Sequence, residues 1–170
     1  PQIEKYAEKG DKKKYKLPKP IINKGGCNLS FAGLKTAVLK ISKQIKTDKE
    51  KFDLAASFQK TIEEILYQKS KVAFKEFKKI HNSENNTFVI AGGVAANKKI
   101  REVLTNLCIE ENFNPIFPPN NLCGDNAAMI ALVGLEKFKL NKFDTFDHPP
   151  KPRWSLDESA AFLKGAGVKL

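Results

Sequence analysis

The sequence predicts an α/β layer fold, and three observations support this prediction. Residues 87–91 (TFVIA) form a short, continuously apolar and β-branched segment, which is typical of a strand buried on both faces. A second strand-like segment, 113–120, ends in prolines. Segments with apolar residues at helical spacing lie before, between and after these two, and strands that alternate with helices indicate an α/β layer fold.

The N-terminal part of the chain is predicted to alternate short elements and loops. A short helix over 1–10 would end at Gly10, and the lysines and prolines of 11–20 (DKKKYKLPKP) indicate a loop or an edge hairpin. Those lysines are either simply solvated or form an arm that contacts phosphate. Residues 27–31 (CNLSF) have a strand-like pattern that Gly33 breaks. A helix follows, and its apolar face comprises Leu34, Ala37, Val38, Ile41 and Ile45.

A long helix is predicted over 47–80. Thr47 and Glu50 fit a capping box, in which each side chain bonds the backbone N–H of the other residue. Its predicted buried face comprises Leu54, Phe58, Ile62, Leu66, Ala73 and Phe77. A later helix has its apolar residues at Ile100, Val103, Leu104, Leu107 and Cys108. The segment 125–138 is predicted to be a helix with a face of small residues, and the tail over 146–158 to be extended because of its prolines.

Composition restricts the classes of protein and of partner. The chain carries 30 Lys+Arg against 19 Asp+Glu, a formal charge of +11. That surplus favours a polyanionic partner, because neutralising phosphates releases condensed counterions, although a lysine-rich proteome would produce it too. No apolar run reaches the roughly 18 residues of a membrane helix, so no membrane association is expected. Cys27, Cys108 and Cys123 lack C-x-x-C spacing, which argues against disulfides or a zinc knuckle and for a reducing, cytoplasmic location.

The chain begins with Pro1 rather than Met, so we expect it to be part of a longer protein. Within it we expect a first segment over 1–26, made of the N-terminal helix and the basic loop, an α/β lobe over 27–147 and an extended tail over 148–170. His81 and His148 lie far apart in the sequence and are expected to be solvated. No motif places either histidine near a nucleophile, so a hydrolase contained in these residues is not expected.

The stretch 88–100 (FVIAGGVAANKKI) carries the first candidate site. Gly92 and Gly93 follow the end of a strand, where glycines let the backbone approach a ligand closely. The next helix would present unpaired N–H groups and a positive dipole end to an anionic or nucleotide ligand. The Asn97 amide offers both a donor and an acceptor there. The alternative is a tight turn in which Asn97 is an ordinary N-cap.

The stretch 122–131 (LCGDNAAMIA) repeats this arrangement, with Gly124 in the turn and Asp125 opening a helix. Asp125 is either a helix cap or a carboxylate that points into the same cleft as a ligand for a hard metal ion. Lys35, at a third turn that contains glycine, is expected to face water. We expect the two junctions that carry Asn97 and Asp125 to converge on one hollow.

Four motifs occur in the order and spacing of a known family. They are SFAGLKTAV (30–38), VIAGGVAANKKIREVL (89–104), LCGDNAAMIA (122–131) and KPRWSLDE (151–158). On these motifs, the chain resembles the TsaD/Kae1/Gcp family of tRNA N6-adenosine threonylcarbamoyltransferases, once labelled glycoproteases. The opening PQIEKYAEKGD also resembles the family's stretch after a Gly-Gly-Pro turn, so the likeness covers nearly the whole chain.

The resemblance implies the two-lobed actin/Hsp70/sugar-kinase-like (ribonuclease H-like) fold, with a nucleotide between the lobes and this chain as the C-terminal lobe. Such an enzyme transfers threonylcarbamoyl from threonylcarbamoyl-AMP to N6 of the adenosine adjacent to the tRNA anticodon and releases AMP. By the same resemblance, Asn97 would contact the adenylate, and Gly92 and Gly93 would form the turn on its phosphate side. Glu4 would reach the ribose. Asp125 would be a ligand of one divalent metal, iron or zinc.

The resemblance also implies partners of the TsaB and TsaE type. The family's H-x-x-x-H metal pair and N-terminal phosphate loop are not among these residues, so the chain alone is expected to be inactive and to self-associate through an exposed lobe surface. Ala32 stands where Ser is common in the family, and Gly124 where Thr is common. Two alternatives stay open: an ATP-binding lobe of another actin-like-fold kinase or ATPase, and a non-catalytic module for tRNA binding or assembly.

Overall fold

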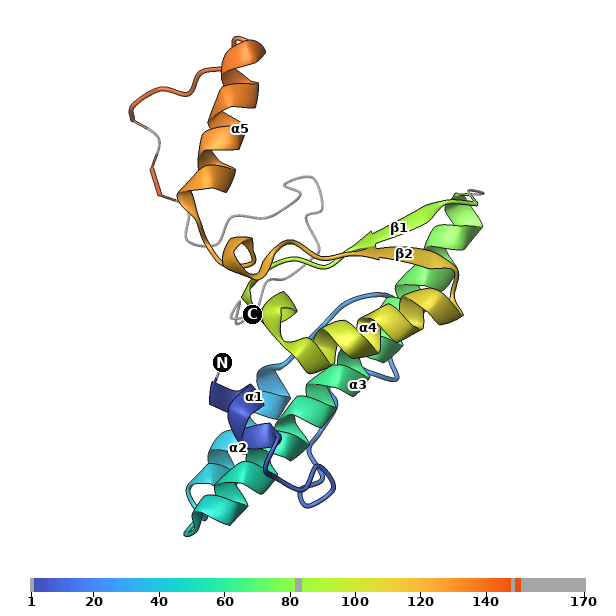
Figure 1. Cartoon of the computed structure of the whole chain (residues 1–170), viewed down its shortest axis with the longest axis vertical. Coiled ribbons are helices and arrows are strands. Elements are labelled where there is room, and N and C mark those ends of the chain that lie inside the picture. The colour runs from blue at the N-terminus through green and yellow to red at the C-terminus, as the bar shows by residue number, and fades with distance from the viewer. Residues whose placement is uncertain (1, 82–83, 148, 151–170) are drawn as a thin grey trace. The chain divides into compact units, whose positions relative to one another are not determined.

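The computed structural model of the protein describes residues 2–81, 84–147 and 149–150 (Figure 1). The chain divides into two units, Pro1–Gly124 and Asp125–Leu170. The elements of the first unit are, in order, α1 (Gln2–Ala7), α2 (Ala32–Ser42), α3 (Asp48–Ile80), β1 (Asn86–Val89), the 3₁₀ helix η1 (Gly93–Ala96), α4 (Lys98–Glu110), β2 (Phe113–Ile116) and the 3₁₀ helix η2 (Asn120–Leu122). The described part of the second unit contains α5 (Ala127–Lys139). This mixture of helices and strands confirms the α/β class.

Strands β1 and β2 form a parallel pair, and α4 connects them. Asn86 lies opposite Phe113 and Val89 opposite Ile116. Both predicted strands are therefore present, but the prediction that the first is buried on both faces is wrong. The face of β1 that carries Phe88 packs on α3 and α4, whereas Val89 on the other face is 60% exposed. Within the described residues the pair is covered by helices on the Phe88 face, so only that face is part of a core.

Two clusters of buried apolar side chains stabilise the first unit, and α3 contributes to both. The first cluster comprises Phe74, Ile100, Leu104, Leu107, Cys108 and Phe113. Phe74 stacks on Phe113 with ring centroids 3.9 Å apart and meets Phe88 edge-on at 4.8 Å. The second cluster comprises Leu17, Leu34, Leu54 and Ile65. Because α3 belongs to both clusters, it joins α1, α2 and the basic loop to the strand–helix–strand part of the unit (Figure 1).

Helix α3 begins as its capping box predicts. The Thr47 hydroxyl accepts from the Glu50 N–H at 3.2 Å, and the Glu50 carboxylate accepts from the Thr47 N–H at 3.0 Å. The predicted buried face is only partly confirmed: Leu54 is buried, but Phe77 is 39% exposed. The other four predicted residues, Phe58, Ile62, Leu66 and Ala73, are half-buried. Phe74 takes the interior place instead, since it inserts between the rings of Phe88 and Phe113.

The residues before α3 depart from prediction in two places. Residues 27–31 are not a strand, and Cys27 and Leu29 are exposed; no neighbouring strand among the described residues pairs with this segment. Gly33 does not break an element but lies inside α2, which ends at Ser42 and leaves Ile45 beyond it. A strand-like pattern requires a partner strand to become a strand, and this segment has none in the part of the chain that the structure describes.

Helix α5 is the described helix of the second unit, and none of its residues is buried. The predicted tail over 148–170 and the KPRWSLDE motif lie outside the described residues, apart from 149–150, and so does His148. Among the residues that are described, no helix combines the length and the apolar character needed to cross a membrane.

Candidate functional site

The turn between β1 and α4 has a backbone that only glycine adopts readily. Gly92 has φ 93° and ψ 168°, a region that side chains with a Cβ avoid. Gly93 then begins η1, and Gly92, Gly93 and Val94 are all exposed. A Cβ built on Gly92 or Gly93 would meet no atom within 4 Å. The turn therefore presents uncovered backbone, and its first glycine is required by conformation alone.

Asn97 has the N-cap role that was the alternative to ligand binding. Its Oδ1 accepts from the Ile100 N–H at 3.0 Å, and its Nδ2 donates to Gln59 Oε1 at 2.9 Å. These two bonds use one of the amide's two donor hydrogens and one of its two acceptor lone pairs. The side chain is part-buried rather than sealed in the interior. Asn97 is thus held rigidly with hydrogen-bonding capacity left over.

Glu4 lies at the same helix end, although it comes from the opposite end of the sequence. Its Oε1 accepts from the Lys98 N–H at 2.7 Å, across a separation of 94 positions. The N–H groups of Lys98 and Ile100 are therefore already hydrogen-bonded, to Glu4 and Asn97 respectively. The prediction that α4 presents unpaired N–H groups to an anion is wrong for these two donors. The structure nevertheless brings Glu4, Gly92, Gly93 and Asn97 together around the start of α4.

Arg101 connects this turn to the chain that follows β2, and the sequence carried no signal for that role. Its Nε donates to the Ala95 carbonyl of η1. Its Nη2 donates to the Pro118 carbonyl at 2.9 Å and to Cys123 Sγ at 3.2 Å. The guanidinium also lies over the Phe117 ring, 4.8 Å from its centroid. Since parallel strands end at one edge of a sheet, Arg101 fixes the two strand-to-helix junctions to each other within the first unit.

Asp125 belongs to the second unit and is exposed. The alternative in which it caps a helix is wrong, because the cap of α5 is Asn126, whose Oδ1 accepts from the Met129 N–H at 3.0 Å. An N-cap carboxylate would have explained an aspartate at this place. A role for the Asp125 carboxylate, and the convergence of Asn97 and Asp125 on one hollow, stay predictions.

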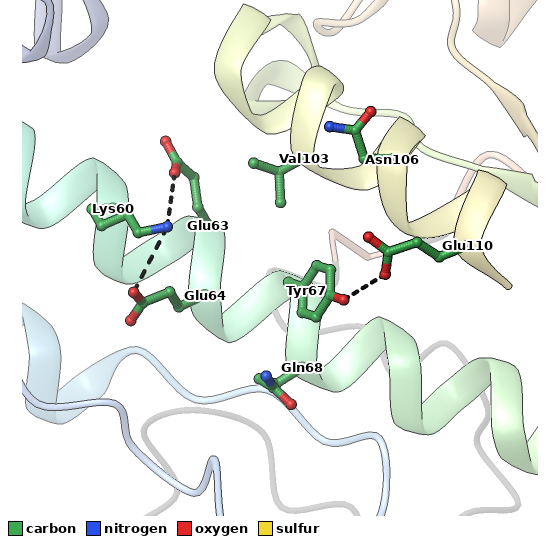
Figure 2. A pocket seen from close by; sticks show the side chains of 8 residues that line it. All are labelled: Lys60, Glu63, Glu64, Tyr67, Gln68, Val103, Asn106 and Glu110. Atoms are coloured by element: carbon green, nitrogen blue, oxygen red, sulfur yellow. Dashed lines mark hydrogen bonds and ion pairs between the residues drawn. The ribbon is translucent and has the colours of Figure 1, made fainter.

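A hollow of about 320 Å³ lies between α3 and α4 (Figure 2). It is lined by Lys60, Glu63, Glu64, Tyr67, Gln68, Val103, Asn106 and Glu110. Lys60 Nζ lies 3.8 Å from Glu63 and 3.7 Å from Glu64, and the Tyr67 hydroxyl donates to Glu110 at 2.6 Å. Burial raises the pKa of Glu63. None of the predicted site residues lines this hollow, and three carboxylates against one ammonium make it a poor place for a phosphate.

Comparison with known proteins shows the family to which this chain belongs. The model of the family described as "TsaD: tRNA N6-adenosine threonylcarbamoyltransferase" matches residues 1–132. The chain belongs to the TsaD family. It is 77% identical, over all of its 170 residues, to the tRNA N6-adenosine threonylcarbamoyltransferase of Pelagibacter ubique (strain HTCC1062), of which it covers 48%. It is also 52% identical, over 160 residues, to the protein of the same name from Rickettsia bellii (strain OSU 85-389). That match covers 93% of this chain and 47% of the relative.

The TsaD match confirms the resemblance read from the motifs, and the matched range includes every predicted site residue. The chain spans about half the length of the curated relatives it matches. The described residues do not by themselves fit a complete metal site, because none of their groups of histidine, cysteine, aspartate or glutamate side chains has three members placed so that they could hold a metal ion. Asp125 could hold a metal only together with ligands from elsewhere.

Proposed function

We propose that this chain is the C-terminal, actin-like lobe of a tRNA N6-adenosine threonylcarbamoyltransferase. In that reaction the adenosine N6 attacks the carbamoyl carbon of threonylcarbamoyl-AMP. A C–N bond forms, the bond from that carbon to the phosphate oxygen breaks, AMP leaves and N6 loses a proton. The observation that carries the proposal is the convergence of Glu4, Asn97 and the glycine turn at the start of α4, within the range matched to TsaD.

Each residue of the turn has a role that its contacts support. Gly92 and Gly93 leave the backbone open, so the phosphate side of the adenylate can approach it. The donor and lone pair that Asn97 does not use in capping are available to the adenylate. Glu4 has acceptor capacity beyond its bond to Lys98, which suits the hydroxyl donors of a ribose. With this positioning, proximity supplies much of the rate for a weak nucleophile such as an aromatic amine.

The remaining expectations rest on the family. Asp125 would contribute one carboxylate to a divalent metal, iron or zinc, whose other ligands come from outside the described residues. We also propose TsaB- and TsaE-type partners and a cytoplasmic location. The apolar side chains of α5, among them Ile130 at 65% and Leu132 at 59% exposed, support the expected self-association of this chain when it is alone.

The test is threonylcarbamoyl transfer by the complete protein, with labelled threonylcarbamoyl-AMP and tRNA. Asn97→Ala and Asp125→Ala should each lose most of the transfer. Because Asn97 is also a cap, Thr47→Ala is the matched control: it removes the N-cap of α3, at a similar cost of about 1 kcal/mol, away from the turn. Undiminished transfer by both site variants contradicts the assignment of the site.

Two further assays on the complete protein separate the alternatives. Release of phosphate from ATP in the absence of tRNA would favour a kinase or ATPase lobe. Salt-sensitive tRNA binding that survives the removal of both Asn97 and Asp125, without transfer by the unaltered protein, would favour a non-catalytic module. The net charge of +11 is the observation that keeps the second alternative in view.

A further inference from the structure

The lysine-rich loop after α1 is anchored to α3 by buried polar side chains. Asp53 Oδ1 accepts from the Asp11 N–H at 2.7 Å. Ser57 Oγ accepts from the Tyr15 N–H at 3.1 Å and donates to the Asp11 carbonyl at 3.3 Å. Asp53 is 4% and Ser57 1% exposed. The loop backbone is therefore held at Asp11 and at Tyr15 by side chains that are themselves buried.

Both ends of the loop are fixed as well. A Cβ on Gly10 would lie 2.0 Å from the Phe52 carbonyl oxygen, so the backbone of Gly10 lies directly against α3. At the other end, Leu17 is 6% exposed and packs with Leu34 and Leu54 in the second cluster. A loop with no role beyond connection needs none of these contacts. The backbone of this loop is held in one arrangement, and its lysine side chains are exposed.

What the anchored loop presents is positive charge. Lys12, Lys13, Lys14 and Lys16 are all exposed, and none of the four takes part in an ion pair among the residues that the structure describes. Three acidic groups lie near them: Asp11 accepts from the backbone N–H of Lys13 at 2.8 Å, and Glu50 and Glu63 act at a distance on Lys14 and Lys12. Holding four like charges together without partners is unfavourable, and a polyanion relieves that repulsion.

The loop also lies close to the proposed site, because α1 connects the two. Glu4 of α1 bonds the start of α4, and Gly10 begins the loop six positions later. Lys12 follows Glu4 by eight positions, so the two residues are at most about 28 Å apart even along a fully extended chain, and α1 shortens that distance. An RNA that places an adenosine at the glycine turn is large enough to span this distance to the loop.

We propose that the exposed lysines of 12–16, called here the lysine loop, form the surface on which the phosphate backbone of the tRNA substrate docks. The assignment rests on the proposed function for the identity of the RNA. The lysine loop would make the phosphate contacts that position the RNA, whereas the residues around the glycine turn would select the adenosine.

The experiment measures tRNA binding by the complete protein as a function of salt. The triple variant Lys12→Gln/Lys13→Gln/Lys14→Gln should weaken binding at least about tenfold near 0.1 M salt and reduce the slope of log K against log salt by about 2–3. The matched control is Lys71→Gln/Lys75→Gln/Lys79→Gln, which removes the same charge from α3. At 1.5 Å per residue, Lys75 is about 27 Å along the helix from Ser57, and this control should bind within about twofold of the unaltered protein.

A second variant tests the anchoring rather than the charge. Ser57→Ala keeps every lysine but removes the group that bonds Tyr15 and Asp11, so it should also weaken tRNA binding while the helical circular dichroism stays unchanged. Replacing the three lysines by arginine should preserve binding. The KM for threonylcarbamoyl-AMP should not change in the glutamine triple variant.

The outcomes separate this inference from the proposed function. Normal transfer together with unaltered tRNA affinity and salt slope in the glutamine triple variant overturns the inference and leaves the function standing. Equal losses in the triple variant and its control overturn it too, because net charge alone would then explain both. If the unaltered protein binds tRNA through the loop but transfers nothing, the inference stands and the proposed function fails.

Discussion

Two adjacent glycines in the Gly92–Asn97 turn should respond to alanine in opposite ways. Gly92 has φ 93°, where an L side chain is strained, whereas Gly93 is outside the positive-φ region. Neither Cβ would meet an atom within 4 Å, so steric contact does not distinguish the two positions. The pair therefore separates backbone strain from every other effect of adding a methyl group.

The expected difference follows from two free-energy terms. Alanine lowers the conformational freedom of the unfolded chain and so stabilises by about 0.4–1 kcal/mol at either position. That term is common to both variants and cancels in their comparison. What remains is the strain at Gly92, about 1–3 kcal/mol. With a urea m-value of about 2 kcal/mol/M, the unfolding midpoint of Gly92→Ala should lie about 0.5–1.5 M below that of Gly93→Ala.

The assay is urea unfolding of both variants, followed by AMP binding to the complete protein. Gly93→Ala should be at least as stable as the unaltered chain and yet bind AMP about tenfold more weakly, a loss of about 1.4 kcal/mol, because its Cβ enters the space that the phosphate needs. Equal midpoints for the two variants would refute the argument from backbone strain. Unchanged AMP affinity in Gly93→Ala would refute the argument from close approach.

Two further predictions concern stability. Arg101→Lys keeps the positive charge but loses the planar guanidinium that bonds the carbonyls of Ala95 and Pro118. The free energy of unfolding, measured by urea titration, should therefore fall by about 1–3 kcal/mol. An unchanged value would mean that these bonds do not stabilise the fold. Burial raises the pKa of Glu63 above its ordinary 4.5, so above pH 4.5 the folded chain retains a proton that the unfolded chain releases, and stability falls as pH rises through that window. Glu63→Gln should remove this fall in stability. Urea midpoints that change with pH in the same way for the variant and for the unaltered protein would contradict the prediction.

Much of the local structure could be predicted because its determinants lie within one helical turn. The capping box of Thr47 and Glu50 and the cap at Asn97 each depend on residues three positions apart. For α5 the same reasoning offered Asp125 as one alternative for the cap, one residue before the actual cap Asn126, because both residue types favour that position. The predicted strand over 27–31 failed for a different reason, since a strand depends on a partner that its own sequence does not contain.

The sequence by itself determined the class of fold, the positions of most helices and both strands, and, through its motifs, the family. Its motifs also predicted a site formed by Gly92, Gly93, Asn97, Glu4 and Asp125, which stays a prediction. Only the tertiary structure brought Glu4 to the start of α4, made Arg101 the connection between two junctions and turned a run of lysines into an anchored surface. The physical reason is distance along the chain: a cap is decided by neighbouring residues, whereas a bond across 94 or 42 positions exists only after the helices have packed.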